Sequence, residues 1–162
     1  MIELVKYVES LSSLEGVTII EQGAGNILFL KDGDKFSLTL FEGNKGFSLV
    51  YFYKSTQSII EIPFADALEV VNKLNSKSER DARVSYIKEI DAFAIITVNR
   101  WYPEDALLFN NPALKVELNR RLKIVFLSMV VETWRMAVDL STAMSNYFIG
   151  RHLSENNSEE GM

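Results

Sequence analysis

The chain has 162 residues, of which 48% are hydrophobic and 24% are charged, as in an ordinary soluble domain. It contains no cysteine and one histidine, which excludes disulfides, thiolate nucleophiles, iron–sulfur clusters, Cys-rich zinc sites and multi-histidine metal sites. Its 17 basic and 22 acidic residues give a net charge of −5, and an acidic surface disfavours non-specific binding of nucleic acid.

The N-terminal part of the sequence predicts a helix followed by an antiparallel meander. From Ile2 to about Leu14, apolar residues recur every three or four positions, which indicates an amphipathic helix, and Gly16 then ends it. Short β-type runs follow, separated by turn residues rich in Gly, Asn and Asp. They predict four strands, over Val17–Gln22, Ile27–Lys31, Phe36–Glu42 and Phe47–Lys54.

The middle of the sequence predicts a second helix and a hairpin. A short apolar run at Ile59–Ile62 indicates one more strand, and an amphipathic pattern over Phe64–Asn75 indicates a helix. The segment Arg100–Pro112 contains prolines and no clear period, so we expect it to be irregular. Before it lies the predicted hairpin, with strands over Val84–Glu89 and Phe93–Asn99.

The last helix is the most informative element. From Ala113 to about Phe148 the sequence has no proline and no glycine, which predicts a helix of ~36 residues, roughly 54 Å long. At ~100° per residue its apolar side chains form two stripes about 180° apart. The first stripe contains Leu122, Val125, Met129, Met136, Leu140, Ala143 and Tyr147. The second contains Ile124, Leu127, Val131, Trp134 and Val138.

The second stripe needs a cover, because a single sheet can cover only one face of a helix. Its 3-4-3-4 spacing is that of a helix–helix seam. The cover is either the N-terminal helix of the same chain or a second copy of the chain, and we favour the second copy. These five residues are therefore the candidate dimer interface. Beside the stripe runs a polar strip, in which we expect Arg135 to pair with Glu132 and Asp139.

No repeat or linker divides the chain, so we expect one α+β domain over residues 1–153 and a disordered acidic tail over 154–162. The N-terminus lacks the basic and apolar regions of a signal peptide. The longest nearly unbroken apolar run, Leu122–Val131, is well short of the ~20 residues that cross a bilayer. We therefore expect a cytoplasmic protein without a membrane segment.

The motifs that resemble catalytic or ligand sites have simpler explanations. Gly23-Ala24-Gly25 lacks the third glycine of a dinucleotide fingerprint and precedes a strand, so a hairpin turn is favoured. Asp32 and Asp34 fit a turn, His152 fits a surface histidine just beyond the C-terminus of the last helix, and Glu104 and Asp105 fit a solvated pair. We therefore predict no catalytic, cofactor or metal site, and no enzyme.

Two further groups of residues could contact a partner. Trp101, Tyr102 and Phe109 lie in the proline-bounded segment, where they either line a groove for a partner or cover the core. Arg120, Arg121 and Lys123 form the densest basic run, which is either a nucleic-acid patch or, as we favour, a solvated helix face.

The order of helix, antiparallel meander, helix, hairpin and long helix, together with the Asn-x-x-Asn helix end at Asn72 and Asn75, resembles the YbjN family of bacterial sensory-transduction regulators. Here the last helix is longer and Trp101–Pro112 replaces a compact polar turn. The resemblance implies a fold like that of type III secretion chaperones, with helices on one sheet. It also implies a homodimeric, chaperone-like regulator with an unidentified protein partner. The alternative is a small-molecule-binding or enzymatic domain with a pocket between sheet and last helix.

Overall fold

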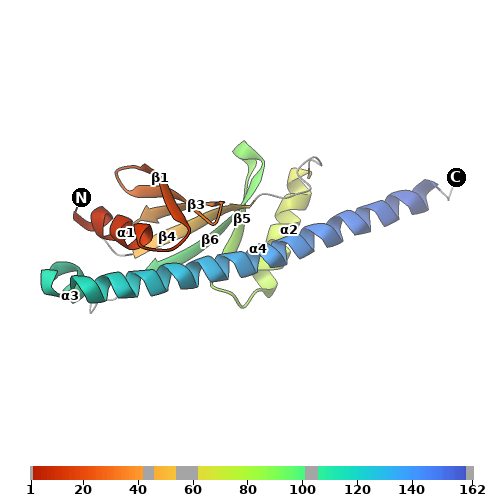
Figure 1. The fold of residues 1–162 in the computed structure, drawn as a ribbon. Coiled ribbons are helices and arrows are strands. Elements are labelled where there is room, and N and C mark those ends of the chain that lie inside the picture. Colours follow the sequence, from red (N-terminus) through yellow and green to blue (C-terminus); the bar gives the residue numbers. More distant parts are fainter. Residues whose placement is uncertain (1, 42–45, 54–61, 101–105, 160–162) are drawn as a thin grey trace.

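The structure is a computed structural model that describes residues 2–41, 46–53, 62–100 and 106–159 (Figure 1). Its helices and strands follow the α+β order expected from the sequence. In chain order they are α1 (Ile2–Ser12), β1 (Val17–Gln22), β2 (Asn26–Lys31), β3 (Asp34–Leu40), β4 (Gly46–Tyr53), α2 (Phe64–Lys77), β5 (Arg83–Ile87), η2 (Lys88–Ile90), β6 (Ala92–Arg100), α3 (Ala106–Asn110), η4 (Pro112–Leu114) and α4 (Lys115–Glu159). The strand expected at Ile59–Ile62 lies, except for its last residue, outside the described residues.

The six strands form one antiparallel sheet in the order β1-β2-β3-β4-β6-β5. The first four strands are a meander, and β6 pairs with β4, so that β5 forms the outer edge. The turn between β2 and β3 places Asp32 and Gly33 at φ of 52° and 90°. Two positive φ values in a two-residue turn match the twist of a hairpin, and Asp-Gly tolerates them. This turn fixes the pairing of Lys31 with Asp34, so β3 begins before the predicted Phe36.

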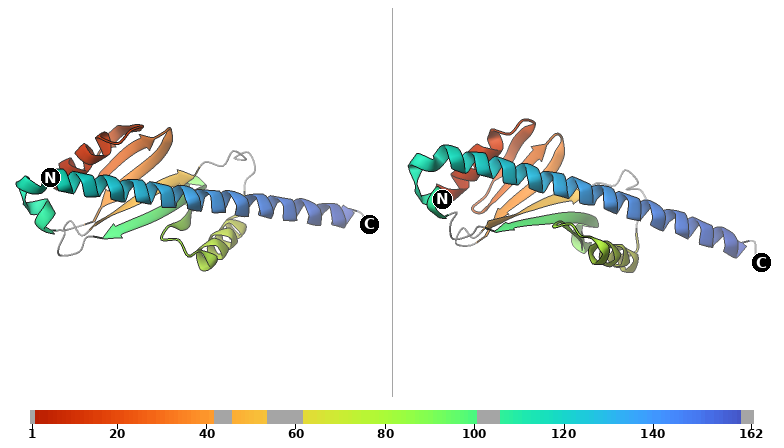
Figure 2. Two further views of the ribbon diagram at one scale, coloured as in Figure 1. Left: turned by 60° about the horizontal axis from the view of Figure 1, so that its bottom comes forward. Right: turned by 90° about the horizontal axis from the view of Figure 1, so that it is seen from below.

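Helices α1 and α4 lie across one face of the sheet, and α2 lies beside β5 and α4 (Figure 2). The core between them is centred on three rings from three elements. Phe126 of α4 lies 5.2 Å from Phe47 of β4 and 6.2 Å from Tyr7 of α1, measured between ring centroids. All three side chains are fully buried. The core also contains one polar contact, in which the buried hydroxyls of Thr97 (β6) and Thr133 (α4) lie 2.9 Å apart.

Helix α4 is longer than predicted. It has 45 residues and continues past Phe148 and through Ser154–Glu159, where we expected a disordered tail. Gly150 does not interrupt it, because a single glycine in an exposed helix costs only about 1 kcal/mol relative to alanine and no proline follows. The C-terminal part of α4 extends beyond the sheet (Figure 2).

The segment Arg100–Pro112 is not irregular throughout, and for residues 106–110 that prediction was wrong. Ala106–Asn110 forms the short helix α3, and η4 follows at once. The side chain of Asn111 accepts a hydrogen bond from the backbone N–H of Ala113 at 3.0 Å, and Pro112 occupies the first turn. A helix of five residues is too short to produce a recognisable apolar period.

Asn75 joins α2 to the sheet edge and does not end the helix, which continues to Lys77. Its side-chain amide donates to the carbonyl of Val84 at 2.8 Å and accepts from the N–H of Val84 at 2.9 Å. These two bonds satisfy backbone groups of the edge strand β5 that would otherwise lack a partner in the sheet.

We expect the substitution Asn75→Ala to lower the free energy of unfolding by about 1–3 kcal/mol, because it leaves two backbone groups of the buried Val84 unsatisfied. The matched control is Asn72→Ala, an exposed position on the same helix, which should change stability by less than about 0.5 kcal/mol. Urea unfolding monitored by circular dichroism measures both variants. Equal losses in the two variants would contradict this role of Asn75.

Candidate protein-binding surface

Helix α4 has a buried face and an outer face, as its two apolar stripes predicted. On the buried face, Leu122, Met136 and Leu140 are fully enclosed. On the opposite side, Ile124, Leu127, Val131 and Val138 are 54%, 44%, 42% and 65% exposed, and Trp134 is half-buried. We call these five residues the outer stripe.

Helix α1 does not cover the outer stripe. Its own apolar side chains, Tyr7 and Leu11, are buried in the core. It meets α4 on another side, where Ser10 donates to the Oδ1 atom of Asn119 at 2.9 Å. Of the two covers considered from the sequence, the N-terminal helix is therefore excluded, because α1 does not cover the outer stripe of its own chain.

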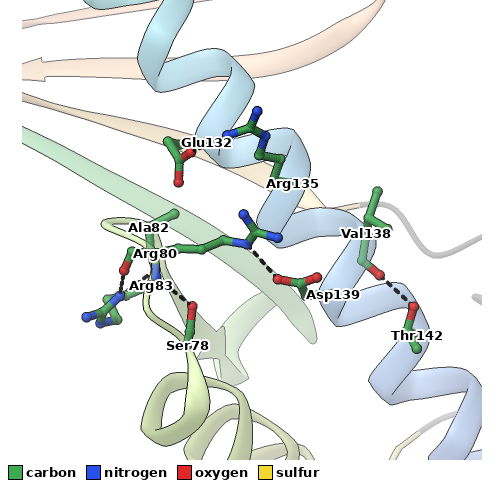
Figure 3. Close-up of polar contacts among 9 residues, drawn as sticks. All are labelled: Ser78, Arg80, Ala82, Arg83, Glu132, Arg135, Val138, Asp139 and Thr142. Atoms are coloured by element: carbon green, nitrogen blue, oxygen red, sulfur yellow. Dashed lines mark hydrogen bonds and ion pairs between the residues drawn. The ribbon is translucent and has the colours of Figure 1, made fainter.

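The polar strip beside the outer stripe is paired differently from our prediction. Arg135 forms the expected ion pair with Glu132 at 3.1 Å. Asp139 pairs instead with Arg80, which comes from the connection between α2 and β5, at 2.7 Å (Figure 3). This hydrogen bond raises the pKa of Arg80 above its ordinary value. The ion pair therefore joins α4 to the α2–β5 connection, while Val138 projects from a different side of the helix (Figure 3).

Polar residues flank the outer stripe at both ends. At its N-terminal end, Glu117 pairs with Arg120 at 2.7 Å and with Arg121 at 3.2 Å. The hydrogen bond from Arg120 lowers the pKa of Glu117 to about 2. Arg120 and Arg121 of the basic run are exposed and paired with Glu117, as is typical of a solvated helix face. At the C-terminal end lie Ser141 and Ser145.

The second predicted contact group is only partly visible. Trp101 and Tyr102 lie outside the described residues, so the structure does not place them. Phe109 is buried, 6.2 Å from Tyr7 between ring centroids, and the ammonium of Lys6 lies 5.4 Å from its ring centroid. Phe109 therefore belongs to the edge of the core. Sequence reasoning could not find Lys6 as its neighbour, because the two residues are far apart in the chain.

Among the described residues, two of the surface grooves lie beside α4. One of ≈590 Å³ lies beside Phe109, between α1, α3 and the start of α4. The other, of ≈310 Å³, lies between α2 and α4, where the hydroxyl of Tyr147 donates to Asp66. Burial and this hydrogen bond raise the pKa of Tyr147. Neither groove lies at the place expected for a small-molecule pocket, since the space between sheet and α4 is filled by core side chains such as Phe47 and Phe126.

The motifs that resembled catalytic or ligand sites in the sequence consist of turn and surface residues where the structure describes them. Gly23 donates its backbone N–H to the carbonyl of Asn26 at 2.8 Å in the β1–β2 turn. Asp32 pairs with Lys31, and Asp34 accepts from the hydroxyl of Tyr51 at 3.3 Å. The side chain of His152, like Glu104 and Asp105, lies outside the described part of the chain. Within that part, no three potential metal-ligating side chains come together.

The face of the sheet opposite α4 has no described helix on it (Figure 1). Along β4, Phe47, Leu49 and Tyr51 point into the core, while the alternate residues Val50 and Phe52 are half-buried on the opposite face. The neighbouring strand β6 adds further apolar side chains to this face. Its Ile96 pairs with Val50, and its Val98, two residues further along, is 47% exposed. Among the described elements none packs on it, so it is a second uncovered apolar surface.

These features define an α+β protein in which a long helix covers one face of an antiparallel sheet and presents an apolar stripe outward. No family model and no curated protein sequence matches the chain. A chain from the solved "Structure of the HopA1-SchA Chaperone-Effector Complex" is similar to it, with 11% identity and a TM-score of 0.42, over 75% of this chain and 93% of that chain. In the described part of the chain, no helix combines the length and the apolar character needed to span a membrane.

Proposed function

We propose that the chain is a non-enzymatic, chaperone-like protein-binding regulator of the YbjN type that acts as a homodimer in the cytoplasm. The observation that carries this proposal is the exposure of the outer stripe. Four of its residues are more than 40% exposed although they recur at the spacing of a helix–helix seam. A second α4 offers the same spacing and the same apolar surface, which makes a second copy the matching cover.

The free energy gained by covering the outer stripe is comparable with the cost of association. Covering the exposed half of each of these side chains contributes about 1 kcal/mol, or about 8 kcal/mol for the two copies together. Association itself costs roughly 4–15 kcal/mol in lost translational and rotational freedom. The outer stripe can therefore offset much of that cost, and the rest must come from neighbouring residues of α4.

The geometry leaves surface for another protein in the dimer. The outer stripe faces away from the sheet, because α4 lies on the sheet with its opposite side (Figure 2). Pairing through α4 therefore leaves the apolar face around Val50, Phe52 and Val98 uncovered in both copies. An apolar sheet surface of this kind suits a segment of another polypeptide.

We expect the double substitution Leu127→Asp and Val131→Asp to weaken dimerisation at least a hundredfold, because two carboxylates would enter an apolar interface. Size exclusion with light scattering should give twice the chain mass of 18.4 kDa for the original protein and once that mass for the variant. The control is Val5→Asp, an exposed apolar position on α1, which should remain dimeric. A monomeric original protein at micromolar concentration would contradict the homodimer.

The same three proteins test the binding role when they carry an affinity tag. If the dimer is the working form, a polypeptide from the native cytoplasm should co-purify with the original protein and the Val5→Asp control, but less with the double variant. Equal recovery of the same polypeptide with all three would show that binding does not depend on the dimer.

A further inference from the structure

The residues that continue the 3-4 spacing beyond the outer stripe are charged at its N-terminal end and carry hydroxyls at its C-terminal end. Before Ile124 come Glu117 and Arg120, and after Val138 come Ser141 and Ser145. We infer that the two copies of α4 pair antiparallel, about a point midway between Val131 and Trp134. This inference rests on the proposed homodimer and adds the direction of its helices.

A parallel pair is disfavoured by the charges. It would bring Glu117 against its counterpart in the second copy, and Arg120 against its own counterpart, within the same seam. Like charges that face each other across a seam repel, and here both residues are already engaged in an ion pair of 2.7 Å within one helix. The parallel arrangement would therefore crowd two such pairs together and remove water from them.

The antiparallel pair places apolar residues against each other at the centre of the seam, while Ile124 faces Ser141. With this midpoint, Leu127 faces Val138 of the second copy and Val131 faces Trp134. Arg120 then faces Ser145, whose hydroxyl can accept a hydrogen bond from a guanidinium. The dipoles of the two helices also oppose each other, as electrostatics favours.

The same reversal matches two exposed apolar residues outside the outer stripe. Val116 is 83% exposed near the start of α4, and Ile149 is 59% exposed near its far end. About the chosen midpoint these two residues face each other. The part of α4 that extends beyond its own sheet (Figure 2) then lies beside the start of the second copy's α4. The extension thus gains a neighbour in addition to α2, which contacts α4 within one chain.

Cysteine cross-linking can test this arrangement, since the chain has no cysteine of its own. We would prepare Leu127→Cys and Val138→Cys as separate variants, one with an affinity tag, and mix them under a mild oxidant. Residues 127 and 138 are about 16 Å apart along one helix. A disulfide requires Cα atoms within about 7 Å, so each orientation allows only one kind of cross-link.

The antiparallel arrangement predicts at least ten times more cross-linked mixed dimer than either variant gives alone. Self-cross-linking of Leu127→Cys would overturn the antiparallel direction and leave the homodimer standing. A monomer in light scattering would overturn both, and a dimeric mass without any cross-link would overturn the pairing through α4. The pair Ile124→Cys and Ser141→Cys, which face each other about the same midpoint and lie about 25 Å apart along one helix, repeats the test if a first variant folds poorly. Val5→Cys on α1 gives the background level of cross-linking.

Discussion

Replacing Phe126 with alanine is expected to lower the free energy of unfolding by about 3–5 kcal/mol. The side chain is 1% exposed and packs against the rings of both Phe47 and Tyr7, so that its removal leaves a cavity where three elements meet. It also removes two aromatic contacts that contribute beyond the buried area. Urea unfolding followed by circular dichroism measures the loss.

The control for this substitution is Val5→Ala on α1, where the side chain is 54% exposed. We expect a change of less than about 0.5 kcal/mol at this position. A loss below 1 kcal/mol for Phe126→Ala would contradict the close packing of this side chain against β4 and α1.

The substitution Gly46→Ala should destabilise the protein by about 3–5 kcal/mol, through backbone strain and a steric clash together. Gly46 begins β4 at a φ of +140°, which side-chain-bearing residues rarely adopt. An added Cβ would lie 2.1 Å from the carbonyl oxygen of Asn99 and 2.8 Å from the Cα of Arg100. Both atoms belong to the backbone of β6, so β4 and β6 would have to separate locally.

Gly25→Ala is the matched control for this glycine, because no atom lies within 4 Å of the Cβ it would add. It should leave the midpoint of thermal unfolding nearly unchanged or raise it slightly, since alanine restricts the unfolded chain more than glycine does. A loss for Gly25→Ala as large as that for Gly46→Ala would show that neither clash nor strain is the cause.

The sequence predicted those parts of the fold that depend on neighbouring residues. The strand β1 was placed at its observed bounds, and Asp32-Gly33 marked a turn, because alternation and turn chemistry are local signals. The insertion of β6 between β4 and β5 was not predicted, since pairing between distant strands leaves no local signal. The contact between Asn75 and Val84 was missed for the same reason, although Asn75 was noticed.

The candidate surface was predicted in part, because helix geometry alone separates the outer stripe from the buried face. The centre of the buried face was less well placed. Phe126 and Thr133 are both fully buried but were not assigned to it, since a threonine does not register as apolar and its partner Thr97 lies on another element. What covers the outer stripe could not be read from one chain at all, because the answer depends on a surface outside it.

The two hydroxyls in the core have a consequence for recognition. Around them α4 packs on the sheet through apolar side chains, whereas Thr97 and Thr133 reach each other at one setting of the helix only. A shift of α4 by one residue would leave both hydroxyls buried without a hydrogen-bond partner, at a loss of about 1–3 kcal/mol each. This pair therefore fixes the position of each outward side chain of α4 relative to the sheet. Any docking molecule consequently meets the same arrangement of side chains.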